Sequence, residues 1–478
     1  MSIHSSPLDS GQPRALAFLV AVALVVGCVA GFGAFVFRQL IGLFHNLSFR
    51  QLFSSLYDAN QHTAGTAPVW LPLVALPSGA LVVTWLVRNF APEAKGHGVP
   101  EVLDAVHFKN GHIRPIVVLI KALASSITIG SGGSAGREGP IVQIGAAFGS
   151  FMGGLLRLDH SDRVTLLAAG AGAGIAATFN APLGGVLFAV EMFLLRLDFR
   201  AIALVALTVV SSAFVGRVLM GSAPSFDVPA LQLPDYAAEP VYVLVAFASL
   251  GVALGAFSGL FIRGLYWAED IANRIRVNEY LRNAAGMALV GVLLVCLHAG
   301  TGHYFVEGVG YAVIMDVLTD VEYAPALLLL LAFLKLCATC MTIGFGGSGG
   351  IFSPSLVMGA CLGAGFGLLV DRLIPGTGVS VPTYALVGMA GLAAATTGAF
   401  FASVVMLTEM SGDSGIILPI LLCAATAWIV RHQLCAPSIY NLKLLRRGLS
   451  VPEAFPADPR ASLRGARPQQ SSQKGDQR

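Results

Sequence analysis

Two long stretches of the sequence contain almost no charge, and they decide what kind of protein the chain can form. Residues 164–190 contain no Asp, Glu, Lys or Arg, and residues 336–408 contain only Asp371 and Arg372. A helix that crosses a membrane needs about 20 predominantly apolar residues. Charged residues make up 12% of the chain, whereas soluble domains carry about 25%. The sequence therefore predicts an integral membrane protein with several spans.

About a dozen apolar runs follow one another along the chain, and many are rich in glycine or broken by proline. Backbone that faces lipid must satisfy its own hydrogen bonds, so broken spans have to be buried in protein or line a cavity. This pattern favours a transporter or channel over a simple anchor. We expect an all-α, multi-pass protein of the cell membrane, in contact with lipid.

The two ends of the chain are polar. Residues 1–14 are expected to form a polar N-terminal segment, and residues 441–478 hold eight Lys or Arg against three Asp or Glu. A basic tail after the last apolar run predicts a disordered cytoplasmic segment by the positive-inside rule. Both termini are therefore expected in the cytoplasm. Nucleic-acid binding is the other interpretation of a basic tail, and we expect none.

The two halves of the sequence resemble each other. Residues 129–153 and 343–367 are identical at 11 of 25 positions without a gap, and flanking segments recur in the same order at offsets of 212 to 218 residues. Self-similarity at a fixed spacing indicates an internal repeat. We expect a first membrane repeat at 15–225, a loop at 226–240 and a second membrane repeat at 241–440.

Glycine-rich turns interrupt the apolar segments at matching positions of the two halves. Interrupted segments of this kind indicate a substrate site at the repeat interface. A helix that begins inside the membrane has unpartnered N–H groups with partial positive charge, and glycine turns let these groups converge on an anion. Such backbone donors suit conduction, which needs loose binding. The four turns are Gly96–Gly98, Gly132–Gly139, Gly308–Gly310 and Gly346–Gly350.

Arg137 and Glu138 are the only charged residues from 122 to 156. An acidic side chain at membrane depth is costly and indicates a functional site. A structural Arg–Glu pair is the alternative interpretation, but the second half has Ile351 and Phe352 at the matching positions. An ionised carboxylate in an anion site would block it, and a protonated or displaced one would leave it open. We therefore predict that Glu138 gates the path.

Five short motifs occur in one order over about 345 residues. Residues 136–140 (GREGP) resemble a gating-glutamate motif, and residues 350–354 (GIFSP) and 96–100 (GHGVP) resemble two anion-site motifs. Residues 180–183 (NAPL) resemble the start of a core helix, and residues 438–440 (SIY) resemble a last helix whose tyrosine lines the site. Together these motifs resemble the CLC family of chloride channels and proton-coupled anion exchangers.

The resemblance implies an inverted repeat of about eighteen helical segments, some of them re-entrant or broken. It also implies a homodimer with a separate pore in each protomer, Glu138 as the external gate, and no cytosolic nucleotide-sensing domain pair. Lys121 is expected either to supply positive field at an entrance or to extend its amine to an interface. The expected anion-binding residues are His97, Gly98, Ile351, Phe352 and Tyr440, with Lys121, Arg137 and Asn180 in supporting positions.

Two positions depart from the family pattern. His97 stands where the first motif usually has the serine associated with chloride preference, so nitrate or fluoride stays open as the anion. Met192 occupies the position of an internal proton-transfer glutamate. Glu191 is a candidate for the proton path, but it cannot simply replace Met192 because helix neighbours point about 100° apart. The sequence slightly favours passive chloride flow, with proton-coupled chloride antiport as the alternative.

Two other classes compete with an anion transporter. Residues 346–349 (GGSG) fit the signature of an intramembrane serine protease with Ser348 as nucleophile, but no histidine lies in the later apolar runs to act as its base. An unrelated cation carrier would gather carboxylates at the loops of both halves, and the second loop has none. We expect no enzymatic activity, no cofactor and no metal site.

Overall fold

The computed structural model describes residues 12–451 apart from 64–67, 196, 227, 230, 234–239, 320, 322 and 375–377. These residues form seventeen α-helices and two short 3-10 helices, and the extended backbone among them is limited to isolated bridges. Eight of the helices are long and apolar enough to cross a membrane. The expected all-α, multi-pass class with about eighteen helical segments is confirmed.

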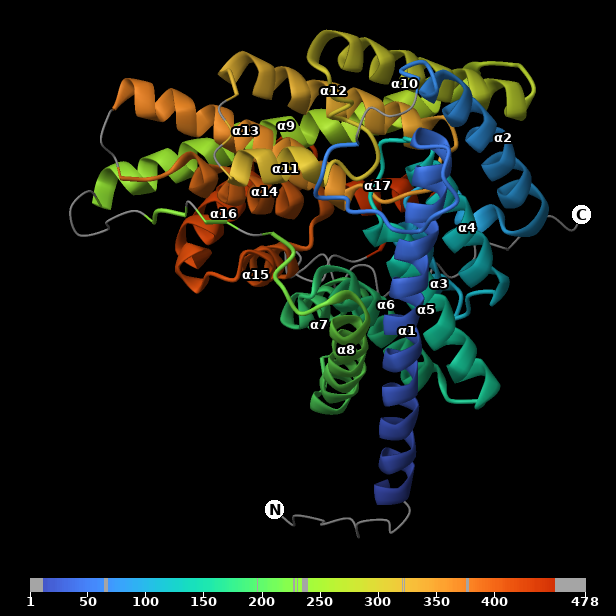
Figure 1. Ribbon diagram of the computed structural model, residues 1–478. Helices are drawn as coiled ribbons and strands as arrows, with labels where there is room; N and C mark the ends of the chain where they lie inside the picture. The colour runs from blue at the N-terminus through green and yellow to red at the C-terminus, as the bar shows by residue number, and fades with distance from the viewer. Residues whose placement is uncertain are drawn as a thin grey trace, which may run out of the picture.

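The helices follow the same order in the two halves (Figure 1). The first half contains α1 (Gln12–Phe49), α2 (Pro72–Phe90), α3 (Val99–Phe108), α4 (Ile116–Gly130), α5 (Glu138–Leu155), α6 (His160–Phe179), α7 (Pro182–Phe193) and α8 (Phe199–Met220). The second half contains α9 (Pro240–Arg274), α10 (Glu279–Thr301), α11 (Tyr311–Leu318), α12 (Pro325–Gly344), α13 (Phe352–Leu373), α14 (Val381–Thr397), α15 (Phe400–Ser411) and α16 (Ile417–Leu434). Helix α17 (Ile439–Arg446) follows, and the 3-10 helices are Pro92–Ala94 and Ser414–Ile416.

Four helices end or begin inside the molecule. Helices α4 and α12 end at Gly130 and Gly344, and α5 and α13 begin after the glycine-rich loops that follow them. The residues of both loops are buried, apart from the half-buried Arg137. Buried helix ends need partners for their free backbone groups, so these loops must find hydrogen bonds elsewhere in the protein.

Helices α7 and α15 hold each other by reciprocal capping. The Glu191 carboxylate, near the end of α7, accepts hydrogen bonds from the N–H groups of Phe400 (2.7 Å) and Ala402 (3.0 Å) at the start of α15. Glu409, near the end of α15, accepts from Leu183 (3.0 Å) and Gly184 (2.7 Å) at the start of α7. Each half therefore supplies the carboxylate that satisfies the other half's helix N-terminus.

The folded body extends beyond both expected boundaries. Helix α1 begins at Gln12, inside the segment expected to be polar and separate, and α17 continues to Arg446, past the expected start of the disordered tail at residue 441. The basic residues after Tyr440 are ordered because acids of other helices pair with them. The pairs are Lys443 with Glu269, Arg446 with Asp270, and Arg447 with Glu101. Residues 452–478 lie outside the described residues, so their disorder stays a prediction.

The reciprocal caps lead to a stability prediction. Replacing Glu409 with Ala removes both acceptors of the α7 N-terminus, and losing such a cap costs about 1 kcal/mol. We expect a lower unfolding temperature for the purified protein in detergent, measured by thermal denaturation. Glu409→Gln retains one acceptor oxygen and should lose less. An unfolding temperature for the Ala variant equal to that of the unmodified protein would show that the cap contributes nothing.

Candidate functional site

The four glycine-rich turns pair with one another across the repeat. Gly136 and Gly350, which occupy matching positions of the two halves, donate to each other's carbonyl oxygens at N···O distances of 2.7 and 2.6 Å. Gly96 donates to Gly347 and Gly349 donates back to Gly96, both at 3.2 Å. Ala135 and the Gly308 carbonyl add a further bond of 3.2 Å. The turns therefore meet at one place in the centre of the protein.

Crossed hydroxyl bonds reinforce this junction. The Ser134 hydroxyl of the first half lies 2.9 Å from the Thr339 hydroxyl on α12, and the Ser348 hydroxyl of the second half lies 2.9 Å from the Ser125 hydroxyl on α4. Ser348 also donates to the Ala94 carbonyl at 2.7 Å. These bonds give Ser348 a place in loop pairing rather than the base-activated hydroxyl that a protease requires.

Two buried lysines hold the carbonyl side of the turns. Lys121 on α4 donates to the carbonyl oxygens of Ala94 (3.0 Å) and Gly96 (2.7 Å). Lys335, its counterpart on α12, donates to Val306 (3.0 Å) and Gly308 (2.9 Å). Both side chains are completely buried. Lys121 therefore lies neither at an entrance nor at an interface, and the two expectations for it are wrong, because its amine is taken up by backbone carbonyls.

Glu138 is the first residue of α5, and its carboxylate lies at the junction. The side chain is 2% exposed, and the Tyr311 hydroxyl lies 3.4 Å from its Oε1 atom. Ser353 supports Tyr311 through a hydroxyl contact of 2.7 Å. The Oε2 atom is buried and accepts no hydrogen bond from a described residue. The carboxylate therefore lies in the protein interior with one oxygen unsatisfied.

Arg137 does not neutralise its neighbour Glu138. Its guanidinium carbon lies 5.2 Å from the centroid of the Tyr311 ring and 5.7 Å from that of Phe179, and its Nη2 donates to the Thr178 carbonyl at 3.4 Å. No ion pair joins Arg137 to Glu138 within the described residues. The structural Arg–Glu pair considered from the sequence is therefore absent from this part of the chain.

Glycine is required where the helix starts approach one another. A Cβ atom on Gly98, at the start of α3, would lie 2.7 Å from the Gly139 carbonyl oxygen in the first turn of α5. A Cβ atom on Gly350 would lie 2.8 Å from both the Gly139 nitrogen and the Glu138 Oε2 atom. The starts of α3, α5 and α13 thus meet around one carboxylate. Gly98, Ile351 and Phe352, which were expected at one site, lie at two of these helix starts.

His97 and Tyr440 face each other next to these helix starts. Their ring centroids are 5.7 Å apart, and the side chains are 4% and 2% exposed. Neither nitrogen of His97 has a hydrogen-bond partner among the described residues. Tyr440 lies on α17, which the ion pair between Arg447 and Glu101 (2.5 Å) ties to α3. Salt bridges on α17 therefore fix the position of Tyr440 relative to His97.

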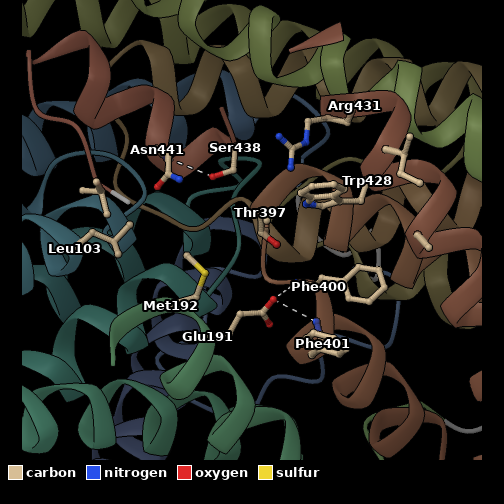
Figure 2. Close-up of a pocket in the computed structure, with 14 residues that line it drawn as sticks. Leu103, Glu191, Met192, Thr397, Phe400, Phe401, Trp428, Arg431, Ser438 and Asn441 are labelled. Carbon is tan, nitrogen blue, oxygen red and sulfur yellow. Dashed lines mark hydrogen bonds between the residues drawn. The ribbon is translucent and has the colours of Figure 1, made fainter. Parts of the chain in front are cut away.

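A cavity of 350 Å³ lies beside α7 and α15 (Figure 2). Met192 and Glu191 line it together with Phe400, Trp428 and Arg431. Figure 2 shows the Glu191 carboxylate directed at the backbone of Phe400 and Phe401, in line with its capping bonds. The side chain expected to offer a proton path is therefore engaged at a helix N-terminus, and Met192 presents a thioether where the family pattern has an acid.

Asn180 lies away from the glycine turns. It ends α6 with a left-handed backbone conformation, its Nδ2 donates to the carbonyls of Ser222 and Ala223 at 3.0 Å, and its Oδ1 accepts from Arg217 at 2.7 Å. Asn180 thus anchors the segment that follows α8. Its supporting contribution concerns this segment and not the carboxylate of Glu138.

Comparison with known proteins identifies the family. The model of the voltage-gated chloride channel family matches residues 79–432. The chain belongs to this family. An H(+)/Cl(-) exchange transporter, ClcA of Vibrio parahaemolyticus, is 32% identical, with 90% of each chain covered. A putative ClcB-like chloride channel protein of Ralstonia nicotianae is 29% identical, covering 90% of this chain and 97% of its own.

The fold is likewise that of a solved family member. A slow cyanobacterial Cl-/H+ antiporter superposes with a TM-score of 0.79 at 24% identity, with coverage of 90% of this chain and 97% of its own. The similarity extends over both membrane repeats. The expected family and its helical architecture are therefore confirmed.

Sequence reasoning missed several residues of the site. Lys335 was detectable, since it lies 214 residues after Lys121, the same offset that relates the two glycine-rich loops. Tyr311 and Ser353 carry no comparable signal, because their contact with Glu138 joins segments that are far apart in the sequence. The capping by Glu191 was also not anticipated.

Two glycines of one turn allow a matched test of crowding at the site. Gly96 and Gly98 both have positive φ angles, 76° and 87°, but a Cβ atom on Gly96 would meet nothing within 4 Å. We expect Gly96→Ala to cost about 1 kcal/mol through backbone strain alone, and Gly98→Ala to cost more and to reduce chloride flux strongly. Thermal denaturation and flux into proteoliposomes measure the two effects. Equal losses in both variants would contradict the close approach at Gly98.

Proposed function

We propose that the protein exchanges chloride for protons across the cell membrane. The observation that carries this proposal is the buried Glu138 carboxylate at the meeting point of three helix starts, with one oxygen lacking a partner. The exchange activity named for the Vibrio relative supports coupling. The sequence slightly favoured passive flow because of Met192, and we adopt the alternative because of this relative.

The exchange cycle follows from the charge of one side chain. An ionised Glu138 carboxylate has the charge of the transported anion and takes its place at the helix starts, where backbone N–H groups favour negative charge. A proton that neutralises the carboxylate removes this attraction, so the side chain leaves and an anion enters. Return of the carboxylate displaces the anion and delivers the proton to the opposite side. Proton and anion therefore alternate at one site.

The anion is proposed to bind between the helix starts and the His97–Tyr440 pair. Backbone N–H groups at Gly98, Ile351 and Phe352 and the Tyr440 hydroxyl are suitable donors. A neutral His97 ring can donate one further hydrogen bond through a nitrogen, and both of its nitrogens lack partners among the described residues. Because these donors carry no full charge, the anion is held loosely enough to leave.

Met192 requires a proton route without an internal acid. Of the side chains that line the cavity beside α7 and α15, Glu191 and Arg431 are the ionisable ones, and Glu191 is held by the N–H groups of α15. We propose that water in this cavity carries protons toward Glu138. Glu191 is the alternative carrier, and its capping bonds argue for a structural role.

We propose that the start of α1 and the end of α17 face the cytoplasm. The connections after α2, α3, α5, α7 and α9 each contain Lys or Arg, whereas those after α8, α10, α11, α13 and α15 contain none. This asymmetry is the one that the positive-inside rule describes. The ends of α1, α6 and α8 then face outward.

A homodimer is proposed from the family resemblance. Helix α8 exposes Phe214 and Val218, each at 67%, and α7 exposes Leu183 at 62%. Such side chains fit either lipid or a second protomer. The membrane lipid would cover whatever the partner does not.

Flux measurements under opposed gradients test the proposed exchange. Purified protein in liposomes should accumulate chloride against its gradient when only a pH gradient is imposed. Glu138→Gln and Glu138→Ala remove the ionisable carboxylate, so chloride flux should continue passively, without proton coupling and with little pH dependence. Glu191→Gln serves as the control and should remain coupled. Loss of coupling in this control instead of in the Glu138 variants would transfer the proton role to Glu191.

A substitution at His97 tests the anion site. His97→Ser replaces the imidazole with a small hydroxyl next to Tyr440, so the donor to the anion changes while the backbone N–H groups stay in place. We expect altered ratios of chloride, nitrate and fluoride transport, with transport itself retained. Competition between these anions in liposomes measures the ratios. Identical ratios in the two proteins would mean that His97 does not contact the anion.

A further inference from the structure

A second cavity lies beside Glu138 and takes no part in the exchange cycle. It has a volume of 180 Å³ and lies between the ends of α1, α6 and α8 and the segments 58–60 and 221–225. Three guanidinium groups line it, those of Arg38, Arg137 and Arg217, together with one carboxylate, that of Asp58. The lining therefore carries an excess of positive charge.

This positive charge is not neutralised by the protein. None of the three arginines forms an ion pair with a described residue. Arg217 donates its Nε to the neutral Asn180 amide, and the buried Nε of Arg137 has no hydrogen-bond partner among the described residues. Arg38, on α1, likewise makes no side-chain hydrogen bond within the part of the chain that the structure describes. Donors that lack acceptors in a cavity indicate that an anion binds there.

The cavity is one side chain away from the gate. The Arg137 guanidinium lies 5.2 Å from the centroid of the Tyr311 ring, whose hydroxyl is 3.4 Å from Glu138 Oε1. Since a water molecule occupies about 30 Å³ of liquid, the cavity accommodates a small anion together with several waters. An ion held there waits next to the carboxylate that it must replace.

We propose that this cavity is an outer loading site, in which Arg38, Arg137 and Arg217 hold a partly hydrated small anion before Glu138 moves. The proposal rests on the proposed function, because the anion is chloride only if the protein carries chloride. Clefts with one sign of charge raise the local concentration of an oppositely charged substrate by about 10- to 1,000-fold. Asp58 opposes this attraction, so the ion is able to leave toward the gate.

Substitutions of opposite charge effect test the loading site. Right-side-out membrane vesicles present the cavity to the bath, and everted vesicles present the other face. In right-side-out vesicles, Arg38→Gln should raise the chloride concentration for half-maximal uptake about threefold to tenfold, and high ionic strength should reduce the difference. Asp58→Asn keeps the acceptor for the Asn60 N–H (3.0 Å) but removes the charge, so it should lower the half-maximal concentration.

The controls separate charge from structure. Arg38→Lys retains the charge and should behave as the unmodified protein. Arg372→Gln removes a guanidinium near the end of α13, outside this cavity, and should change nothing. In everted vesicles all variants should match the unmodified protein.

Two results would overturn the loading site. One is an unchanged half-maximal concentration in both Arg38→Gln and Asp58→Asn. The other is a shift of both variants in the same direction or equally in both vesicle types. Failure of the proposed function gives a different result, since the unmodified protein would then take up no chloride in either vesicle type.

Discussion

Backbone groups at the broken helices are the constraint on which the rest of the structure depends. Helices that end in the interior leave N–H and C=O groups that neither lipid nor bulk water can satisfy. The protein satisfies many of them with the other half of the repeat. Gly136 pairs with Gly350, and Gly96 pairs with Gly347 and Gly349. The core is therefore a joint product of both halves, and glycine occurs where a side chain would prevent the approach.

The same arrangement accounts for the electrostatics of the site. Lys121 and Lys335 use their amines on carbonyl oxygens of the turns, which leaves the N–H side of these turns directed at the centre. Positive potential therefore arises from backbone dipoles and from buried cations one layer behind them, and no cation contacts the Glu138 carboxylate directly. A site of this kind attracts an anion without trapping it, because a direct ion pair would bind too tightly for turnover.

Local patterns in the sequence predicted the repeat, the glycine turns and Glu138, because scarce charge, clustered glycine and an isolated acid are visible within a few residues. Contacts between distant segments escaped prediction. The caps made by Glu191 and Glu409 join positions more than 200 residues apart, and the ion pairs of α17 depend on acids of α3 and α9. Composition made residues 441–447 look like a tail, and only the positions of Glu101, Glu269 and Asp270 explain why they are folded.

The crossed bonds between the halves also bear on biogenesis. When the first half has left the ribosome, the carboxylate of Glu191 has no α15 to cap, and Ser134 has no Thr339 to meet. The newly inserted helices α4 and α5 then carry unsatisfied polar groups at membrane depth until the second half arrives. Insertion of this protein therefore ends with a late assembly step in the bilayer, and a truncated translation product would remain a polar, unfinished bundle recognisable to quality-control proteases.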